Sequence, residues 1–152
     1  MSLSFRKANY SDLVPIVALL ANDELGSKRE NFTIPLPEKY INAFSKIIND
    51  PNHELIVAVL NEKVVACFQL SFLQYLTYQG GIRAQIEAVR VDENHRGEGI
   101  GKKCFEWAIN RAKEKGAHLL QLTSDKQRPE ALEFYKKLGF TASHEGLKMH
   151  FN

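Results

Sequence analysis

The sequence is poor in cysteine, in long apolar runs and in clusters of like charge. Its two cysteines, Cys67 and Cys104, are far apart, and no Cys/His spacing in the chain suits zinc. Because each lies in an apolar segment, we expect buried free thiols rather than a disulfide or a metal site. No apolar stretch approaches the ~18 residues that a membrane-spanning helix needs, and the N-terminus lacks the apolar core of a signal peptide. These absences predict a cytoplasmic protein with no membrane partner.

Net charge is also small, at +2 for 152 residues, and no basic run carries interleaved aromatic residues. A nucleic-acid partner is therefore not expected. The hydrophobic fraction of 44% and the charged fraction of 25% are ordinary for a globular protein. The length suffices for one domain with a sizeable core, and the chain shows no repeat, low-complexity segment or linker. We therefore expect residues 1–152 to form a single domain.

Hydrophobic periodicity predicts a mixture of strands and helices along the chain. Strands are expected at residues 3–7, 54–60, 64–77, 82–91, 118–122, 140–143 and 147–151. Helices are expected at residues 12–25, 38–49, 99–115 and 129–138, and a polar loop at residues 27–37. Asn61 and Glu62 form a tight turn, so that three antiparallel strands follow one another. Strand and helix alternate after them, which indicates an α/β fold, with α+β character, that contains one locally parallel strand pair.

One glycine-rich stretch, residues 96–103, joins a predicted strand to a predicted helix. Gly97, Gly99 and Gly101 let the backbone approach an anion, because no Cβ stands in the way. The start of the following helix offers unpaired N–H groups and a partial positive charge, and two lysines add further positive charge. The stretch therefore predicts a phosphate or pyrophosphate site, with a turn that binds nothing as the alternative.

Two common phosphate loops do not fit this stretch. A P-loop needs glycine at position 96 and serine or threonine at position 103, where this chain has Arg96 and Lys103. The dinucleotide fingerprint needs glycine at position 102, where this chain has Lys102. The pattern that fits is Arg96-x-x-Gly99-x-Gly101 after a strand. It resembles the acetyl-CoA pyrophosphate loop of the GNAT superfamily, the Gcn5-related N-acetyltransferases.

A second segment is similar to the same family. It reads Ala131-x-x-Phe134-Tyr135-x-x-x-Gly139-Phe140 in this chain. The two motifs agree with the family in order and spacing, and the resemblance covers nearly the whole chain. It implies a mixed, mostly antiparallel central sheet of about seven strands, with helices on both faces and a splayed parallel pair at the CoA cleft. It also implies acetyl-CoA as co-substrate and makes a homodimer possible.

The resemblance also implies which residues bind CoA. The main chain of Val89 and Val91 would pair with the pantetheine arm, and the amides of residues 96–102 would hold the pyrophosphate. A bulge near Val89 would splay the strand and leave a donor for the oxyanion. Many members carry an asparagine near the last helix that is missing here, and Ser124 or Arg128 could replace it. The complete expected set is Ala88, Val89, Arg90, Val91, Arg96, Gly97, Glu98, Gly99, Ile100, Gly101, Lys102, Ser124, Arg128 and Tyr135.

Polar side chains occupy every second position of the strand before the loop. Arg83, Gln85 and Glu87 share one face by the two-residue period, and such a row suits the wall of a cleft. Glu87 is the candidate general base, acting directly or through a water, because an amine must lose a proton before it attacks a thioester. A surface ion pair of Glu87 with Arg83 or Arg90 is the alternative.

Tyr135 is the candidate general acid. In the GNAT superfamily the tyrosine at this place lies by the CoA sulfur and can protonate the leaving thiolate. A phenol can do so late in the reaction, when charge has built up on sulfur. Helical spacing puts Tyr135 on one face with Ala131 and Leu138, so a core aromatic residue is the alternative.

The acceptor side is less defined. In this family the first two helices and the loop between them usually cover the substrate, which makes Arg29 and Glu30 candidates, and the strands add Gln69, Arg83 and Gln85. Arg29 could hold a carboxylate or phosphonate, whereas Glu30 could attract an amine. We expect acetyl transfer to the primary amine of a small molecule by direct attack in a ternary complex. A protein lysine or N-terminal acetyltransferase and a non-catalytic CoA-binding sensor are the alternatives.

Overall fold

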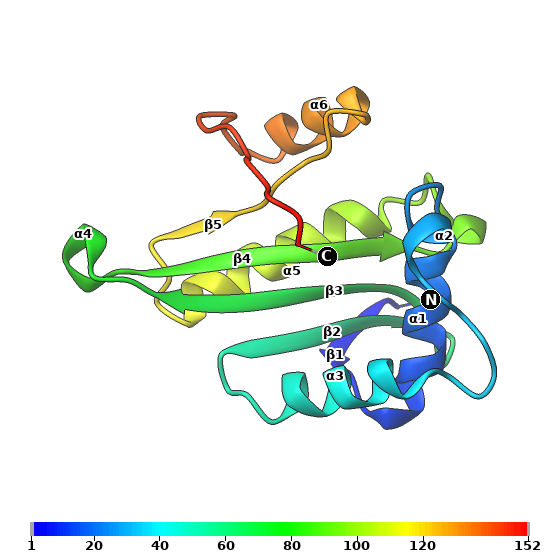
Figure 1. Cartoon of the computed structure of the whole chain (residues 1–152). Helices are drawn as coiled ribbons and strands as arrows, with labels where there is room; N and C mark the ends of the chain where they lie inside the picture. The colour runs from blue at the N-terminus through cyan, green and yellow to red at the C-terminus, as the bar shows by residue number, and fades with distance from the viewer. Residues whose placement is uncertain (1, 152) are drawn as a thin grey trace.

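The computed structural model describes residues 2–151, which form a mixed sheet with helices on both of its faces (Figure 1). The strands lie in the order β1 (Ser4–Lys7), β2 (His53–Leu60), β3 (Lys63–Gln74), β4 (Ile82–Val91) and β5 (Leu119–Gln121). Neighbours are antiparallel from β1 to β4, whereas β5 runs parallel to β4. The helices are α1 (Leu13–Ala21), α2 (Gly26–Arg29), α3 (Glu38–Ile48), α4 (Thr77–Gly80), α5 (Ile100–Glu114) and α6 (Pro129–Lys137), with 3-10 turns η1 (Tyr10–Asp12) and η2 (Glu93–His95).

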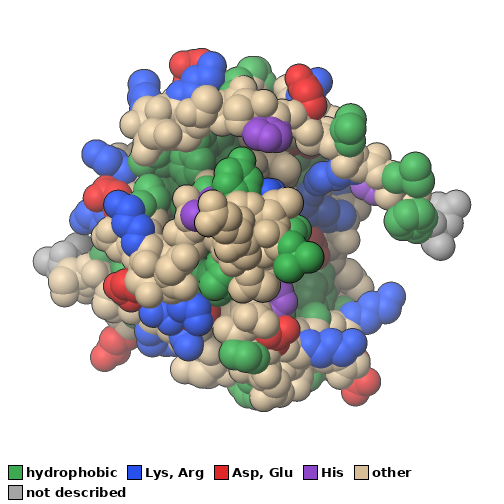
Figure 2. Space-filling model, turned by 90° about the vertical axis from the view of Figure 1, so that its left-hand side faces the viewer, with side chains coloured by type: hydrophobic (Ala, Val, Ile, Leu, Met, Phe, Trp, Pro, Cys, Tyr) green, Lys and Arg blue, Asp and Glu red, His purple; other side chains and the backbone are tan. Residues whose placement is uncertain are grey.

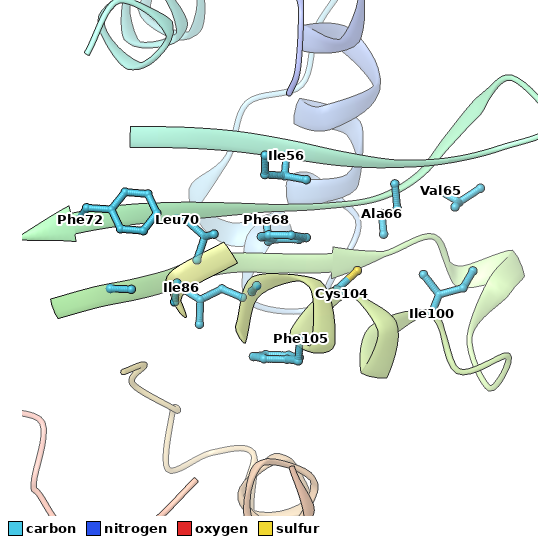
Figure 3. Close-up of a cluster of buried hydrophobic side chains, with 14 residues drawn as sticks. Ile56, Val65, Ala66, Phe68, Leu70, Phe72, Ile86, Ile100, Cys104 and Phe105 are labelled. Carbon is cyan, nitrogen blue, oxygen red and sulfur yellow. The ribbon is translucent and has the colours of Figure 1, made fainter. Parts of the chain in front are cut away.

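The main core lies between the sheet and α5 (Figure 3). Ile56, Phe68 and Leu70 from the sheet meet Cys104 and Phe105 from α5, and none of the five is more than 2% exposed. Apolar residues of α5 recur at a four-residue spacing, so they form one stripe that faces the sheet. Alternation along β3 sends every second side chain into this core.

The opposite face of the sheet packs against α1 and α3. Ile16 of α1 contacts Val57 and Cys67, and Phe44 of α3 is buried beside α1. Cys67 and Cys104 are both free and buried, as the sequence predicts. Burial raises the pKa of each thiol to about 12, so both remain protonated thiols at neutral pH.

The sequence predictions are confirmed for the elements that surround the glycine-rich stretch. Asn61 and Glu62 turn the β2–β3 hairpin with φ values of 50° and 65°, the left-handed geometry that suits an antiparallel hairpin. The β4–α5–β5 unit contains the predicted parallel pair. Within residues 2–151, no helix is long and apolar enough to cross a membrane, and no cluster of His, Cys, Asp and Glu could hold a metal ion.

The number of strands is the main correction, because the sheet has five strands and not about seven. The sequence predicts strands at residues 140–143 and 147–151, but the described part of the chain contains no strand after β5. The alternating pattern of these segments suits a strand, yet neither segment has a strand beside it. Since a strand exists only through hydrogen bonds to a neighbour, pattern alone does not produce one.

The predicted helix over residues 12–25 is the second correction. Helix α1 ends at Ala21, and a separate short helix, α2, begins at Gly26. The backbone N–H of Gly26 donates to the carboxylate of Asp23, which fixes the turn between the two helices. A Cβ at position 26 would lie 1.9 Å from the carbonyl oxygen of Leu20, so this glycine permits a close approach of α2 to α1.

Candidate active site

The glycine-rich loop lies where β4 ends and α5 begins. The side chain of Asp92 accepts a hydrogen bond of 2.9 Å from the backbone N–H of Asn94 and so fixes the η2 turn. Gly97 and Gly99 then take φ values of 81° and 80°, in the left-handed region that glycine tolerates best. Helix α5 has no side-chain cap at its N-terminus. Its first N–H groups are therefore available to an anion.

A pocket of about 320 Å³ surrounds this helix N-terminus. The end of β4, the loop and α6 contribute its lining: Val91, His95, Arg96, Gly97, Gly99, Ile100, Gly101, Lys102 and Phe134. Seven of these nine residues are among the expected CoA-binding residues. Two of them, Arg96 and Lys102, add positive charge to a pocket whose other donors are backbone amides, a combination that suits a pyrophosphate.

Two residues of the lining were missed at the level of sequence. His95 precedes Arg96 directly, and its Nδ1 lies 3.3 Å from Oε1 of Glu98, so Glu98 contacts this histidine and does not itself line the pocket. The ring of Phe134 lies 3.9 Å from the place of a Cβ on Gly101, which brings α6 against the loop. Adjacency to Arg96 could have indicated His95, whereas the contact of Phe134 depends on how α6 packs.

A bulge interrupts β4 directly before the loop. Arg90 pairs with Cys67 of β3, whereas Glu87 pairs with Gln69, so that two residues of β4 face one residue of β3. Ala88 lies in the bulge with a φ of 55°, which is uncommon for a residue with a Cβ. The bulge that the family resemblance implies in this part of β4 is therefore confirmed, and one residue is left outside the regular ladder.

The parallel pair separates next to this bulge. β5 pairs with β4 only from Arg83 to Gln85, so the remainder of β4 has no strand on that side. Ala88, Val89, Arg90 and Val91 lie along this unpaired edge, as does Glu87. The unpaired edge of β4, the bulge and the N-terminus of α5 therefore lie one after another along the chain.

The exposed carboxylate of Glu87 accepts a hydrogen bond from Gln85, which in turn accepts one from Gln121. Gln85 Nε2 donates to Glu87 Oε1 over 2.8 Å, and Gln121 Nε2 of β5 donates to Gln85 Oε1 over 3.0 Å. A carboxylate only accepts hydrogen bonds, so this chain fixes which end of the Gln85 amide faces Glu87. Gln69 lies directly opposite Glu87 on β3 and belongs to the same face of the sheet.

The alternative ion pair of Glu87 with an arginine does not form. Arg90 Nε lies 2.7 Å from Oδ2 of Asp23, which ties β4 to the turn between α1 and α2. The guanidinium carbon of Arg83 lies 4.7 Å from the ring centroid of Tyr75 and 5.7 Å from that of Tyr78. Its Nε is buried without a hydrogen-bond partner, and no ion pair to Arg83 is found within residues 2–151.

Tyr135 belongs to an aromatic cluster beside the main core. Its ring centroid lies 5.6 Å from that of Phe105 and 6.2 Å from that of Phe140, with both pairs edge to face. The ring is half-buried, and its hydroxyl makes no hydrogen bond within residues 2–151. Phe134, the preceding residue, faces the loop pocket instead. The ring of Tyr135 is thus held as a core aromatic residue, while its hydroxyl is free to act on a ligand.

The two candidates for the missing asparagine lie in the connection between β5 and α6. Arg128 is exposed at the N-cap of α6, and its backbone N–H donates to the carbonyl oxygen of Asp125 over 3.0 Å. Ser124 is half-buried three residues after β5. Neither lines the loop pocket, so the structure does not bring them to the pyrophosphate site.

Arg29 and Glu30 lie at the end of α2 and contact each other. Arg29 Nε is 3.3 Å from Glu30 Oε2, while the hydroxyl of Tyr40 donates to Glu30 Oε1 over 2.8 Å. Burial, with the neighbouring Glu30 carboxylate, raises the pKa of Tyr40. Because Glu30 already has two partners, Arg29 is not a free cation and Glu30 is not a free anion.

The glycine loop, the bulge and α6 can now be compared with known proteins. A family model described as the acetyltransferase (GNAT) family matches residues 20–140, which include all three features. This chain belongs to the GNAT family. Its sheet, with a parallel pair that opens beside the loop, agrees with the resemblance seen in the sequence.

Three similar proteins can be compared with this GNAT protein, and two of them are named acetyltransferases. A transcriptional regulator from Bacillus halodurans C-125 is 55% identical with a TM-score of 0.96, over 99% of this chain and 100% of that one. An aminoglycoside acetyltransferase from a soil metagenome, solved with sisomicin, is 25% identical with a TM-score of 0.77, over 99% and 95% of the two chains. The aminoalkylphosphonate N-acetyltransferase of Salmonella typhimurium is 29% identical over 107 residues, or 70% of this chain and 69% of that protein. This GNAT protein is an acetyl-transferring enzyme of a family that uses acetyl-CoA.

Proposed function

We propose that this enzyme moves the acetyl group of acetyl-CoA to the primary amine of a small molecule by direct attack in a ternary complex. One observation carries the proposal: Glu87, the β4 bulge and the uncapped N-terminus of α5 lie in sequence along one opening of the sheet. Residues 1–152 act in it as a single acetyltransferase domain.

Glu87 acts as the general base in this proposal. Its exposed carboxylate takes a proton from the ammonium group, directly or through a water, and frees the nitrogen lone pair. The nitrogen then forms a bond to the thioester carbonyl carbon, and the carbon–sulfur bond breaks as the tetrahedral intermediate collapses. The hydroxyl of Tyr135 gives its proton to the departing thiolate and is restored, through solvent, by the second proton that the nitrogen loses as the amide forms. Gln85 and Gln121 are positioning residues, because they orient the Glu87 carboxylate.

The backbone supplies binding and charge stabilisation. The amides of residues 96–102 and the charges of Arg96 and Lys102 hold the pyrophosphate at the start of α5. The unpaired edge of β4 from Ala88 to Val91 offers main-chain groups to an extended pantetheine arm. A bulge leaves one residue outside the ladder, and its N–H can stabilise the oxyanion of the intermediate. Positioning in this opening provides a large share of the rate.

Arg83 favours an acceptor that carries an anionic group. It lies four residues before Glu87 on the same face of β4, about 13 Å away along the strand. Tyr75 and Tyr78 support its guanidinium, and no acidic side chain neutralises it within residues 2–151. Only an acceptor long enough to span this distance could place its anion toward Arg83 and its amine toward Glu87. The Salmonella relative is named for an acceptor that combines an amine with an anionic group.

A CoA-binding sensor without transferase activity is the second candidate. The 55% identical protein of known structure is named a transcriptional regulator. A sensor needs the loop pocket but has no use for the hydrogen-bonded Gln121–Gln85–Glu87 chain. Acetyl-CoA binding without acetyl transfer would favour it.

The test has two steps. Isothermal titration with acetyl-CoA measures binding, and release of free CoA thiol then measures transfer to amino acids, aminoalkylphosphonates, polyamines, aminoglycosides and short peptides. Binding with thiol release on a small amine is expected. Thiol release with peptides alone would indicate a protein acceptor in place of a small molecule. Acetyl-CoA binding without thiol release on any amine would favour the sensor. Absence of binding would refute both.

Glu87→Gln provides the first variant. We expect kcat/KM to fall about 100-fold, as the loss of a general base predicts, with the largest loss at low pH, where the amine is most fully protonated. Glu106→Gln, an exposed residue of α5, is the matched control and should keep wild-type activity. A Glu87→Gln enzyme whose pH profile matches wild type would exclude the base role.

A further inference from the structure

A row of polar side chains crosses the sheet on the face that carries Glu87. Four residues that pair directly across neighbouring strands form this polar row: His53, Ser71, Gln85 and Gln121. Side chains of residues paired in this way point to the same face of a sheet. Along β4, the row passes through Gln85, which lies midway between Arg83 and Glu87. The polar row therefore flanks the middle of the path that joins the proposed base to the nearest cation on that face.

The polar row lies on a part of the sheet that α1 does not cover. Helix α1 packs on Cys67 of β3, and Ser71 lies four residues further on, about 13 Å along the strand. Ser71 and Gln85 are only half-buried, although both belong to inner strands of the sheet. A polar side chain in a dry interior is costly unless it is hydrogen-bonded, whereas one that borders water or a ligand is not. The row thus borders the space in which an acceptor for Glu87 would lie.

Ser71 keeps hydrogen-bonding capacity beside this midpoint. His53 Nδ1 lies 2.8 Å from Ser71 Oγ, and His53 Nε2 lies 3.6 Å from Oδ2 of Asp50. A carboxylate beside Nε2 favours the tautomer that carries hydrogen there, so that Nδ1 accepts and the Ser71 hydroxyl donates. A serine oxygen has two lone pairs, and within residues 2–151 no other side chain or backbone group bonds to this one. Ser71 can therefore accept a hydrogen bond from a ligand.

Arg83 lies on the other side of the row from Glu87. Its guanidinium carbon is 4.7 Å from the ring centroid of Tyr75 and 5.7 Å from that of Tyr78, which hold it toward the α4 end of the sheet. Figure 2 views the molecule from this end and shows hydrophobic side chains next to basic ones around the α4 turn. Glu87, Ser71 and Arg83 thus present a proton acceptor, a hydrogen-bond acceptor and a cation in that order.

We propose that Ser71 binds a hydrogen-bond donor of the acceptor, an amide N–H or a hydroxyl, placed between its amine and its anionic end. The substrate class is an elongated amine, with its nitrogen at Glu87, its donor group at Ser71 and its anion at Arg83. His53 is a positioning residue, because it acts through the Ser71 hydroxyl. This inference rests on the proposed acetyl transfer for the place of the amine.

Two acceptors of equal length test the subsite. N-(4-aminobutanoyl)-4-aminobutanoate carries an amide in the middle of its chain, and 9-aminononanoate has methylene groups in its place. Ser71→Ala should lower kcat/KM for the amide acceptor about 10-fold, as expected for one lost hydrogen bond. The same variant should change kcat/KM for 9-aminononanoate less than about 2-fold. Ser71→Thr keeps a hydroxyl on a residue that suits a strand, and it should restore most of the activity with the amide acceptor.

Ser143→Ala is the matched control. Ser143 Oγ lies 2.7 Å from His144 Nδ1, but this exposed pair belongs to the segment after α6 and lies outside the sheet. The control should equal wild type with both acceptors. A Ser71→Ala enzyme that loses activity equally with both acceptors, or with neither, would overturn the proposal.

Binding separates the subsite from acetyl transfer itself. Isothermal titration of the amide acceptor into enzyme saturated with CoA needs no turnover, and wild type should bind it about 10-fold more tightly than Ser71→Ala does. A wild type that releases no thiol with any amine would refute the proposed transfer, yet this titration would still decide the subsite. Equal affinities in the two proteins, or no binding to wild type, would refute the role of Ser71.

Discussion

At the scale of the single residue, one hydroxyl separates the two roles considered for Tyr135. Removing it by Tyr135→Phe keeps the ring contacts with Phe105 and Phe140, so the fold and the CoA pocket should be unchanged. We expect kcat to fall about 100-fold, because the thiolate loses its proton donor, while titration gives the wild-type acetyl-CoA affinity. Tyr10→Phe, which removes a hydroxyl on an exposed ring, is the control. A loss of affinity in place of turnover would make Tyr135 a binding residue.

Residues that act within one short stretch were predictable from the sequence. Arg96, Gly99 and Gly101 belong to one short sequence motif, and all three line the pocket. Gln121 is different, because its bond to Gln85 depends on the register of a parallel pair. A parallel pair is joined through a whole helix, so local pattern does not fix that register.

At the scale of the element, the start of α5 can be tested by a pair of glycines. Gly99 and Gly116 flank the helix with φ values of 80° and 79°, and neither has a heavy atom within 4 Å of an added Cβ. Alanine at either position should therefore cost a similar free energy of unfolding, about 1–2 kcal/mol for a left-handed residue. Only Gly99→Ala should also weaken acetyl-CoA binding, by about 10-fold or ~1.4 kcal/mol, because its Cβ meets the anion. Urea unfolding and titration of both variants measure the two effects, and equal affinities would show that the loop does not hold the phosphates.

Elements were predictable where their partners follow closely in the chain. β2, β3 and β4 are joined by short turns, so the pattern of each strand also indicated its neighbour. Residues 140–143 and 147–151 carry a similar alternation without a neighbour in the same chain, and no strand forms there. The split between α1 and α2 depends on Gly26 lying against Leu20, a contact that helical periodicity does not encode.

At the scale of the whole molecule, one buried ion pair joins the sheet to α5. Arg111 donates from Nε and Nη2 to the two carboxylate oxygens of Glu54 over 2.9 and 2.6 Å, and the Glu54 side chain is 3% exposed. The hydrogen bonds from Arg111 hold the pKa of Glu54 below its usual range, against the opposing effect of burial. Arg6 similarly lowers the pKa of Asp12 at the start of η1. The Arg6–Asp12 pair is local, whereas the Arg111–Glu54 pair joins residues 57 positions apart in the chain and therefore bears on global stability.

The lowered pKa values set the direction of the acid response. A carboxyl group whose pKa is lower in the folded state stabilises the fold fully above its unfolded pKa, near ~4.3 for glutamate, and loses this contribution as pH falls through the folded pKa. The free energy of unfolding should therefore drop below about pH 4. Glu54→Gln should cost about 3 kcal/mol at pH 7, as expected when one partner of a buried pair is removed, and should flatten the acid dependence. Glu114→Gln, which loses an exposed contact of 3.1 Å to the same Arg111, should leave both nearly unchanged. Urea denaturation at pH 7, 5, 4 and 3 gives the comparison, and an unaltered acid slope in Glu54→Gln would move the source of acid sensitivity to other carboxylates.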